Sequence, residues 1–177
     1  MSLLNEKENI VLIGMPGCGK STIGVVLAKK LGFRFLDSDL CIQEREGRLL
    51  HEIISSVGLE GFLHIENEVN SGLDVSGCVI ATGGSAVYGK EAMEHLKEIG
   101  IVVYLKLPYF SIRERLGDLK KRGVVLKKGQ TLKGLYEERI PLYEKYADVI
   151  VNCNHKKLRN IVLLICKAVG KGDMVED

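Results

Sequence analysis

An eight-residue stretch near the amino terminus leaves few folds open to this chain. Residues 14–21 read Gly-Met-Pro-Gly-Cys-Gly-Lys-Ser, which matches the pattern GxxxxGK followed by Ser or Thr in full. The apolar run 9–13 precedes it, and the stretch 20–31, with helical periodicity, follows. In that context glycines let backbone N–H groups turn towards phosphate oxygens, and the helix amino end adds positive potential. The pattern predicts a nucleoside triphosphate site; the alternative is a glycine-rich turn that binds nothing.

The residues of this loop have distinct expected roles. Lys20 should reach the β- and γ-phosphates, and the Ser21 hydroxyl should bind Mg²⁺. The other loop residues expected to hold the nucleotide are Gly14, Gly17, Cys18, Gly19 and Thr22. Cys18 is either an oxidation-sensitive thiol or a small residue that simply fits. The loop alone names no reaction, because switches, transporters, motors and small-molecule kinases share it.

The rest of the chain alternates short β-branched runs with amphipathic segments. Further strands are expected at 33–36, 78–82, 101–105 and 149–151. Further helices are expected at 39–47, 49–57, 60–73, 91–99, 110–116, 132–146 and 156–169. Pro141 predicts a kink or break in one of them. Strands that alternate with helices pair in parallel, which predicts a three-layer α/β/α fold of the P-loop NTPase type with a five-stranded parallel sheet. Ligands should then gather at the carboxyl ends of the strands.

Length and composition fit one domain spanning residues 1–177. Apolar residues make up 46% and charged residues 27%, which is the range of soluble globular proteins. The net charge of +2 is too small to favour a nucleic acid or an anionic membrane as partner. Five scattered cysteines without a CxxC pattern, and a start that lacks the pattern of a signal peptide, lead us to expect a cytoplasmic protein with reduced thiols.

Two further polar groups follow predicted strands and should meet the loop at one edge of the sheet. Asp37 and Asp39 stand after the second strand, where one carboxylate can hold a Mg²⁺-bound water and the other can accept a hydrogen bond from a substrate hydroxyl. Alternatively they only cap the next helix, with Asp39 as the candidate cap. Gly83 and Gly84 end the third strand, where bare backbone can touch a ligand. The alternative for this pair is an ordinary strand-to-helix turn.

Arginines in the second half of the chain complete the candidate site. Arg122 lies in a basic, glycine-bounded stretch, and we expect residues 117–131 to form a lid that excludes water and neutralises phosphate charge. The alternative is a solvated basic loop. Arg139 is either part of a salt bridge at the rim or a clamp for a carboxylate. Arg115 is a candidate for stacking on a base.

In this order and spacing, the motifs resemble the shikimate kinase family over about residues 9–169. The resemblance rests on GxxGxGKST at 14–22, DxD at 37–39, ATGG at 81–84, Arg122, and ERxPLY at 138–143. It implies a monomeric phosphotransferase with an alcohol acceptor. The implied reaction transfers the γ-phosphate of ATP, with Mg²⁺, to the 3-hydroxyl of shikimate, a step towards the aromatic amino acids.

The resemblance also implies a role for each matching residue. Asp37 would hold the metal with Ser21, and Asp39 would bind the shikimate hydroxyls on helices within about residues 39–73. The implied catalytic residues are Lys20, Asp39 and Arg122. Arg115 and Arg122 would meet the nucleotide. The implied substrate-binding residues are Asp39, Gly83, Gly84 and Arg139.

Three positions depart from the family pattern. Leu63 stands where the motif FRxxE has a substrate-binding arginine, Ser85 follows two glycines where the family has a triplet, and residues 122–125 read RGVV instead of RPLL. Losing one partner of a buried charge pair costs about 2–5 kcal/mol. His64 offers at most partial compensation, because its neighbouring position on a helix points elsewhere.

Three functions therefore stay open. The first is a shikimate kinase with a weakened or rearranged carboxylate site. The second is a kinase for another hydroxylated small molecule, such as a gluconate-like compound or a polyol. The third is an ATP-binding regulatory domain without catalysis, although such a sensor has no use for Asp39 and Arg139.

Overall fold

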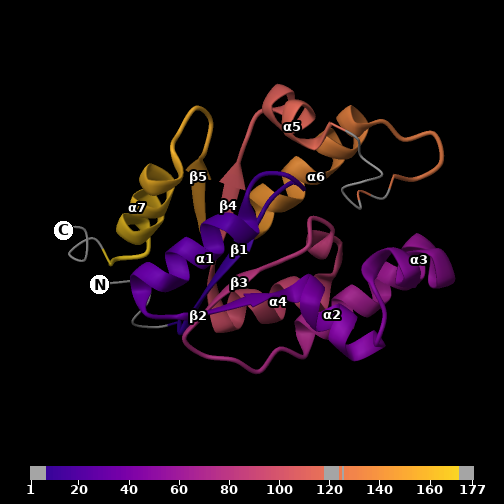
Figure 1. The fold of residues 1–177 in the computed structure, drawn as a ribbon, viewed down its shortest axis with the longest axis horizontal. Coiled ribbons are helices and arrows are strands. Elements are labelled where there is room, and N and C mark those ends of the chain that lie inside the picture. Colours follow the sequence, from indigo (N-terminus) through magenta and orange to yellow (C-terminus); the bar gives the residue numbers. More distant parts are fainter. Residues whose placement is uncertain (1–6, 118–123, 125, 172–177) are drawn as a thin grey trace.

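The computed structural model describes residues 7–117, 124 and 126–171. Its centre is a sheet of five strands, all paired in parallel, in the order β2-β3-β1-β4-β5 (Figure 1). The strands are β1 (Asn9–Ile13), β2 (Arg34–Asp37), β3 (Cys78–Ala81), β4 (Gly100–Lys106) and β5 (Val149–Asn152). The predicted five-stranded parallel sheet is confirmed, and no strand end differs from its predicted position by more than one residue.

Helices cover both faces of this sheet. They are α1 (Lys20–Leu31), α2 (Ser38–Glu46), α3 (Leu50–Ser71), α4 (Lys90–Ile99), α5 (Tyr109–Leu116), α6 (Leu132–Tyr146) and α7 (Leu158–Ala168), with a short 3-10 turn, η2 (Ala86–Tyr88). α1 packs on β1, β2 and β3 and against α7, whereas α4 packs on β1 and β4. Right-handed crossovers require this division, because the chain leaves β1 towards one edge and β3 towards the other. The result is the predicted three-layer arrangement.

Strand β1 lies at the centre of the core because it has a neighbouring strand on each side and helices on both faces of the sheet. All five of its residues are buried, and Val11 lies between Ile80 of β3 and Val102 of β4 in register. A strand covered on both faces reads as a continuous apolar run rather than an alternating one. This explains why the sequence signal for β1 and β4 was strong.

Two predicted irregularities have different outcomes. Gly58 takes a left-handed φ of 72° and separates two helical segments within α3, as its place in the sequence suggested. Pro141 does not interrupt α6, which continues from Leu132 to Tyr146, so the expected break at Pro141 is wrong. Within the described ranges, no helix is long and apolar enough to cross a membrane.

The fold brings the polar motifs to one edge of the sheet. Asp37 is the last residue of β2, the phosphate loop follows β1, and the turn at Gly83 and Gly84 follows β3. In Figure 1, α3 lies on one side of this edge and α5 and α6 lie on the other. The carboxyl ends of β1, β2 and β3 therefore form the floor between two sets of helices.

Candidate active site

A cleft of about 330 Å³ opens above the carboxyl ends of β1, β2 and β3. Its walls come from the phosphate loop, the start of α2, the middle of α3, the turn after β3, and α6. Most of the residues expected to act on a ligand line it: Gly17, Gly19, Lys20, Ser21, Thr22, Asp37, Asp39, Gly83, Gly84 and Arg139. Residues as far apart in the chain as Gly17 and Arg139, 122 positions, thus face one common space.

The phosphate loop has the backbone that its glycines allow. Gly14 and Gly19 have φ values of 148° and 101°, in the region that disfavours residues with a side chain. A Cβ at Gly14 would also come within 2.9 Å of the Cys18 sulfur. Cys18 is 1% exposed and packs in the core beneath the loop, which favours the interpretation that a small residue is needed there. Gly14 and Cys18 shape the loop from below and do not line the cleft.

Lys20 lies at the centre of the loop. Its ammonium donates to the backbone carbonyls of Gly14 at 2.8 Å and Met15 at 3.1 Å, and the residue is only 9% exposed. A buried ammonium needs such partners, because an unpaired charge in a protein interior is costly. The carbonyls therefore hold the positive charge where the loop is expected to bind phosphate oxygens.

Ser21 and Asp37 form a pair of hard oxygen ligands at the edge of the loop. The Ser21 hydroxyl donates to Asp37 Oδ2 at 2.9 Å. Asp37 Oδ1 accepts from the backbone N–H of Asp39 at 3.0 Å, so Asp37 is the N-cap of α2. The expectation that Asp39 is the cap is therefore wrong, because α2 begins one residue earlier than the sequence suggested. The oxygen pair fits Mg²⁺, which takes one or two protein ligands and completes its shell with water and phosphate.

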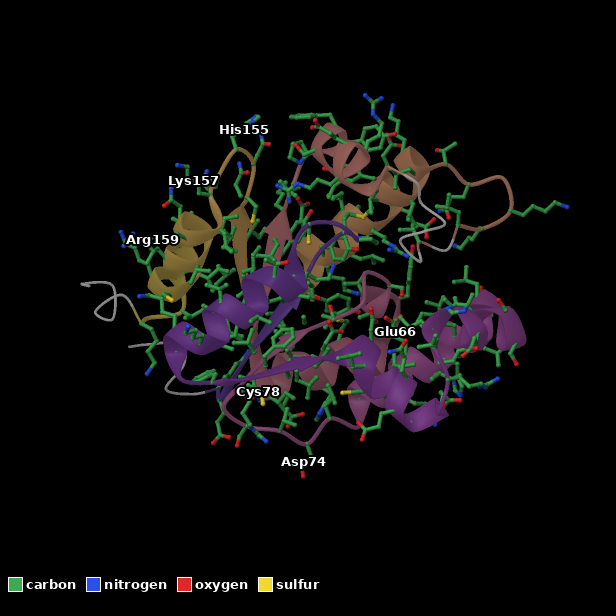
Figure 2. All side chains as sticks on the ribbon, viewed as in Figure 1. Glu66, Asp74, Cys78, His155, Lys157 and Arg159 are labelled. Atoms are coloured by element: carbon green, nitrogen blue, oxygen red, sulfur yellow. The ribbon has the colours of Figure 1, made fainter. Side chains whose placement is uncertain are left out.

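Asp39 and Glu66 bring two carboxyl groups to the other side of the cleft. Burial raises the pKa of Asp39, the charge of Asp37 raises it further, and Lys20 lowers it. Glu66 is 1% exposed, and burial raises its pKa from 4.5 to about 7. The Ser85 hydroxyl donates to Glu66 Oε2 at 2.6 Å, while Oε1 has no hydrogen-bond partner among the described residues. Figure 2 shows Glu66 inside the molecule, between α3 and the turn after β3.

The turn at Gly83 and Gly84 runs close to these carboxyl groups. A Cβ at Gly83 would lie closer than 3.0 Å to Glu66 Oε1 and 2.9 Å from Asp39 Oδ1. A Cβ at Gly84 would lie 3.1 Å from a terminal nitrogen of Arg139. Charged groups of both signs thus meet bare backbone at this turn. A side chain at either position would therefore meet one of these groups.

Arg139 extends from α6 into the cleft and is 4% exposed. Its Nε donates to the Tyr88 hydroxyl at 3.3 Å, and its guanidinium lies 5.2 Å from the centroid of the Tyr88 ring. Among the residues that the structure describes, no carboxylate lies within ion-pair distance of it. The salt bridge at the rim, which was one of the two interpretations of Arg139, is not found there. A buried guanidinium in this setting is suited to an anionic ligand.

Other expected contributors lie outside the cleft. Arg115 is exposed on α5, beside the loop at Gly17, and does not line the cleft. Arg122, with the other residues at 118–123 and 125 of the expected lid, falls outside the described residues. His64 is on the surface, 3.2 Å from Glu68, and Arg45 pairs with the same Glu68 at 2.6 Å. Neither His64 nor Arg45 therefore replaces the arginine absent at position 63.

Glu66 is the residue that the sequence-based site omitted. It ends the stretch Phe62–Glu66 that corresponds to FRxxE, and Phe62 lines the same cleft one helical turn earlier. That spacing of four residues places both side chains on one face of α3. The motif position and the helical spacing together would have identified it.

Comparisons with known proteins agree with one another. A family model described as shikimate kinase matches residues 16–169. The shikimate kinase of Vibrio cholerae is 39% identical over 165 residues, covering 92% of this chain and 95% of that protein. The shikimate kinase of Clostridium botulinum is 38% identical over 146 residues, covering 82% and 87%. The structure of the Acinetobacter baumannii shikimate kinase in complex with shikimate has a TM-score of 0.85 and 34% identity, and covers 94% of each chain.

Proposed function

This chain belongs to the shikimate kinase family, and from that premise we propose which of its residues carry out the reaction. The reaction is the transfer of the γ-phosphate of ATP, with Mg²⁺, to an alcohol acceptor, shikimate. The observation that supports the assignment of residues is a single cleft in which Lys20 and Ser21, Asp39, and Arg139 face one another. A triphosphate, a hydroxyl group and an acid group therefore each have a matching partner in one space.

The phosphate side is formed by Lys20, Ser21 and Asp37. The Lys20 ammonium would neutralise charge on the β- and γ-phosphates, where it costs no reorganisation because the loop carbonyls already hold it. Ser21 and Asp37 would hold Mg²⁺, directly or through water. When bound, the metal neutralises charge between the β- and γ-phosphate oxygens. Arg122 is proposed as a further cation for the γ-phosphate, from its place in the sequence alone.

The acceptor side is formed by Asp39. A carboxylate with a raised pKa takes a proton from a hydroxyl more readily than an ordinary one; burial and Asp37 raise the pKa of Asp39, and the nearby Lys20 lowers it. Glu66, with a pKa of about 7, carries a proton below neutral pH and then adds no negative charge beside Asp39. Asp39 would accept the 3-hydroxyl of shikimate and direct it at the γ-phosphate.

The acid group of shikimate is assigned to Arg139. The support is its burial together with the lack of an ion-pair partner among the described residues. Gly83 and Gly84 would let the substrate ring approach the backbone between Arg139 and Asp39. The helices α2 and α3 would form the substrate side of a single domain spanning residues 1–177, with the lid at about 117–131. The small net charge does not favour a nucleic acid or an anionic membrane as partner. From the family resemblance we propose a monomer that acts in the cytoplasm on small molecules.

A coupled ADP-release assay tests this function. The enzyme is given Mg²⁺-ATP with shikimate and, in parallel, with gluconate, quinate or buffer alone. We expect saturable turnover with shikimate above the buffer blank. Turnover with gluconate or quinate alone would mean that Leu63 marks a changed acceptor. No ATP turnover with any acceptor would contradict the proposal.

A further inference from the structure

A second hollow, of about 490 Å³, adjoins the cleft and shares Leu59 and Arg139 with it. Leu63 and Lys127 line this second hollow. The helix α3 faces both spaces, yet it contains neither lysine nor arginine between Leu50 and Ser71. Any permanent positive charge near Arg139 must therefore come from another part of the chain.

Arg139 has less negative charge around it than a buried guanidinium requires. Its carboxyl neighbours Glu66 and Glu138 are near enough for their charges to interact with it, but neither is within ion-pair distance. Its Nε donates to the neutral hydroxyl of Tyr88. Burying a charge without a partner costs roughly several kcal/mol per ion. The position is therefore suited to an anion that arrives with the substrate.

Lys127 brings a second positive charge to the same aromatic ring. Its ammonium lies 5.9 Å from the centroid of the Tyr88 ring, and the Arg139 guanidinium lies 5.2 Å from that centroid. Lys127 also pairs with Glu138 at 3.3 Å. The same carboxylate accepts from the Tyr88 hydroxyl and, at 2.9 Å, from Gln130. Glu138 thus holds Lys127 at the same Tyr88 ring that Arg139 meets.

We propose that Lys127 is the second cation that recognises the acid group of the substrate, acting with Arg139 and in place of a cation on α3 at position 63. The inference rests on the proposed function, because it takes the carboxylate of shikimate as the anion. A carboxylate has two oxygens, so one can accept from the guanidinium and the other from the ammonium. The substrate would then share Lys127 with Glu138, which is exposed and gives it up at little cost.

The test compares an acid with its uncharged analogue. Lys127→Met is assayed with shikimate and with shikimate amide, as substrates or as competing ligands, with a thermal melt to check folding. We expect the KM for shikimate to rise about tenfold, the equivalent of about 1.4 kcal/mol. Binding of the amide and the KM for ATP should stay unchanged. Lys127→Arg should restore most of the loss, and Lys128→Met, on the next residue, should behave as the unsubstituted enzyme.

Other outcomes would overturn the inference. An unchanged KM for shikimate in Lys127→Met would show that the ammonium does not meet the acid. Equal losses for the acid and the amide would show that Lys127 acts through the local fold. A rise in the KM for ATP alone would put it on the nucleotide side. If the unsubstituted enzyme does not phosphorylate shikimate, the proposed function fails and the inference falls with it.

Discussion

Replacing the buried Glu66 by glutamine should remove a pH dependence from the stability of the folded chain. Glu66 is 1% exposed and has a pKa of about 7, compared with an ordinary value of 4.5. Burial is the largest cause, since a charged carboxylate loses its hydration there, and Asp39 adds repulsion. The hydrogen bond from Ser85 and the charges of Arg139 and Lys20 act in the opposite direction.

The magnitude follows from the two pKa values. Between pH 4.5 and about 7 the folded chain holds a proton that the unfolded chain releases, so stability falls as the pH rises through this window. At roughly 1.4 kcal/mol per pKa unit, the ionised Glu66 costs about 3 kcal/mol above pH 7. Glutamine has the shape of the protonated side chain and never ionises. Above pH 7 the free energy of unfolding of the variant should exceed that of the unsubstituted protein by that amount, and at pH 4.5 the two should differ little.

The measurement is urea unfolding of both proteins at several pH values between 5 and 8. The difference in unfolding free energy between them isolates Glu66, because all other titrating groups are common to both. Glu94→Gln is the matched control, because this carboxylate is 62% exposed on α4. The difference in unfolding free energy between this variant and the unsubstituted protein should not change with pH. A difference between Glu66→Gln and the unsubstituted protein that is the same at pH 5 and pH 8 would refute the reasoning.

Two further replacements test the cleft and the core. Gly83→Ala puts a methyl group closer than 3.0 Å to Glu66 Oε1. We therefore expect kcat/KM for shikimate to fall at least about tenfold, or about 1.4 kcal/mol. Gly134→Ala is the control and should not change kcat/KM, because its methyl group would come no nearer than 3.5 Å to any neighbour. Asn9→Leu removes three hydrogen bonds between a buried side chain and backbone groups, and it should lower the free energy of unfolding by about 3 kcal/mol in urea titrations. A loss under about 1 kcal/mol would mean that those backbone groups find other partners.

The elements of this fold were predictable where local chemistry sets their ends. The helix α1 runs from Lys20 to Leu31 as predicted, because Gly19 and Gly32 take left-handed conformations at its two ends. The start of α2 was harder, because the side chain that caps it, Asp37, also ends a strand. The outcome at Pro141 depends on the whole of α6, which packs against β4, α5 and η2. Such packing can maintain a helix through a residue that weakens it locally.

The site was predictable wherever a motif directly follows a strand. Parallel strands place their carboxyl ends together, which is why Asp37, Gly83 and the phosphate loop line one cleft. Glu66 follows no strand, and although its motif position and helical spacing point to the cleft, its raised pKa arises from burial against Ser85 and Gly83, which lie elsewhere in the sequence. The apolar periodicity of α3 gives no reason to expect a buried carboxyl group. Its raised pKa is a property of the tertiary structure.

Position 63 shows how the absence of one residue differs from the loss of its function. Leu63 stands where the family motif has a positively charged arginine, and α3 contains no lysine or arginine that could replace it. In the structure Leu63 borders a hollow that Arg139 and Lys127 also line, and Lys127 is 64 residues further along the chain than Leu63. An ammonium that is 53% exposed is better hydrated and more screened than a buried guanidinium. Lys127 and Arg139 would therefore bind the acid group more weakly than two buried arginines would. The site would still be positively charged and would still prefer a carboxylate.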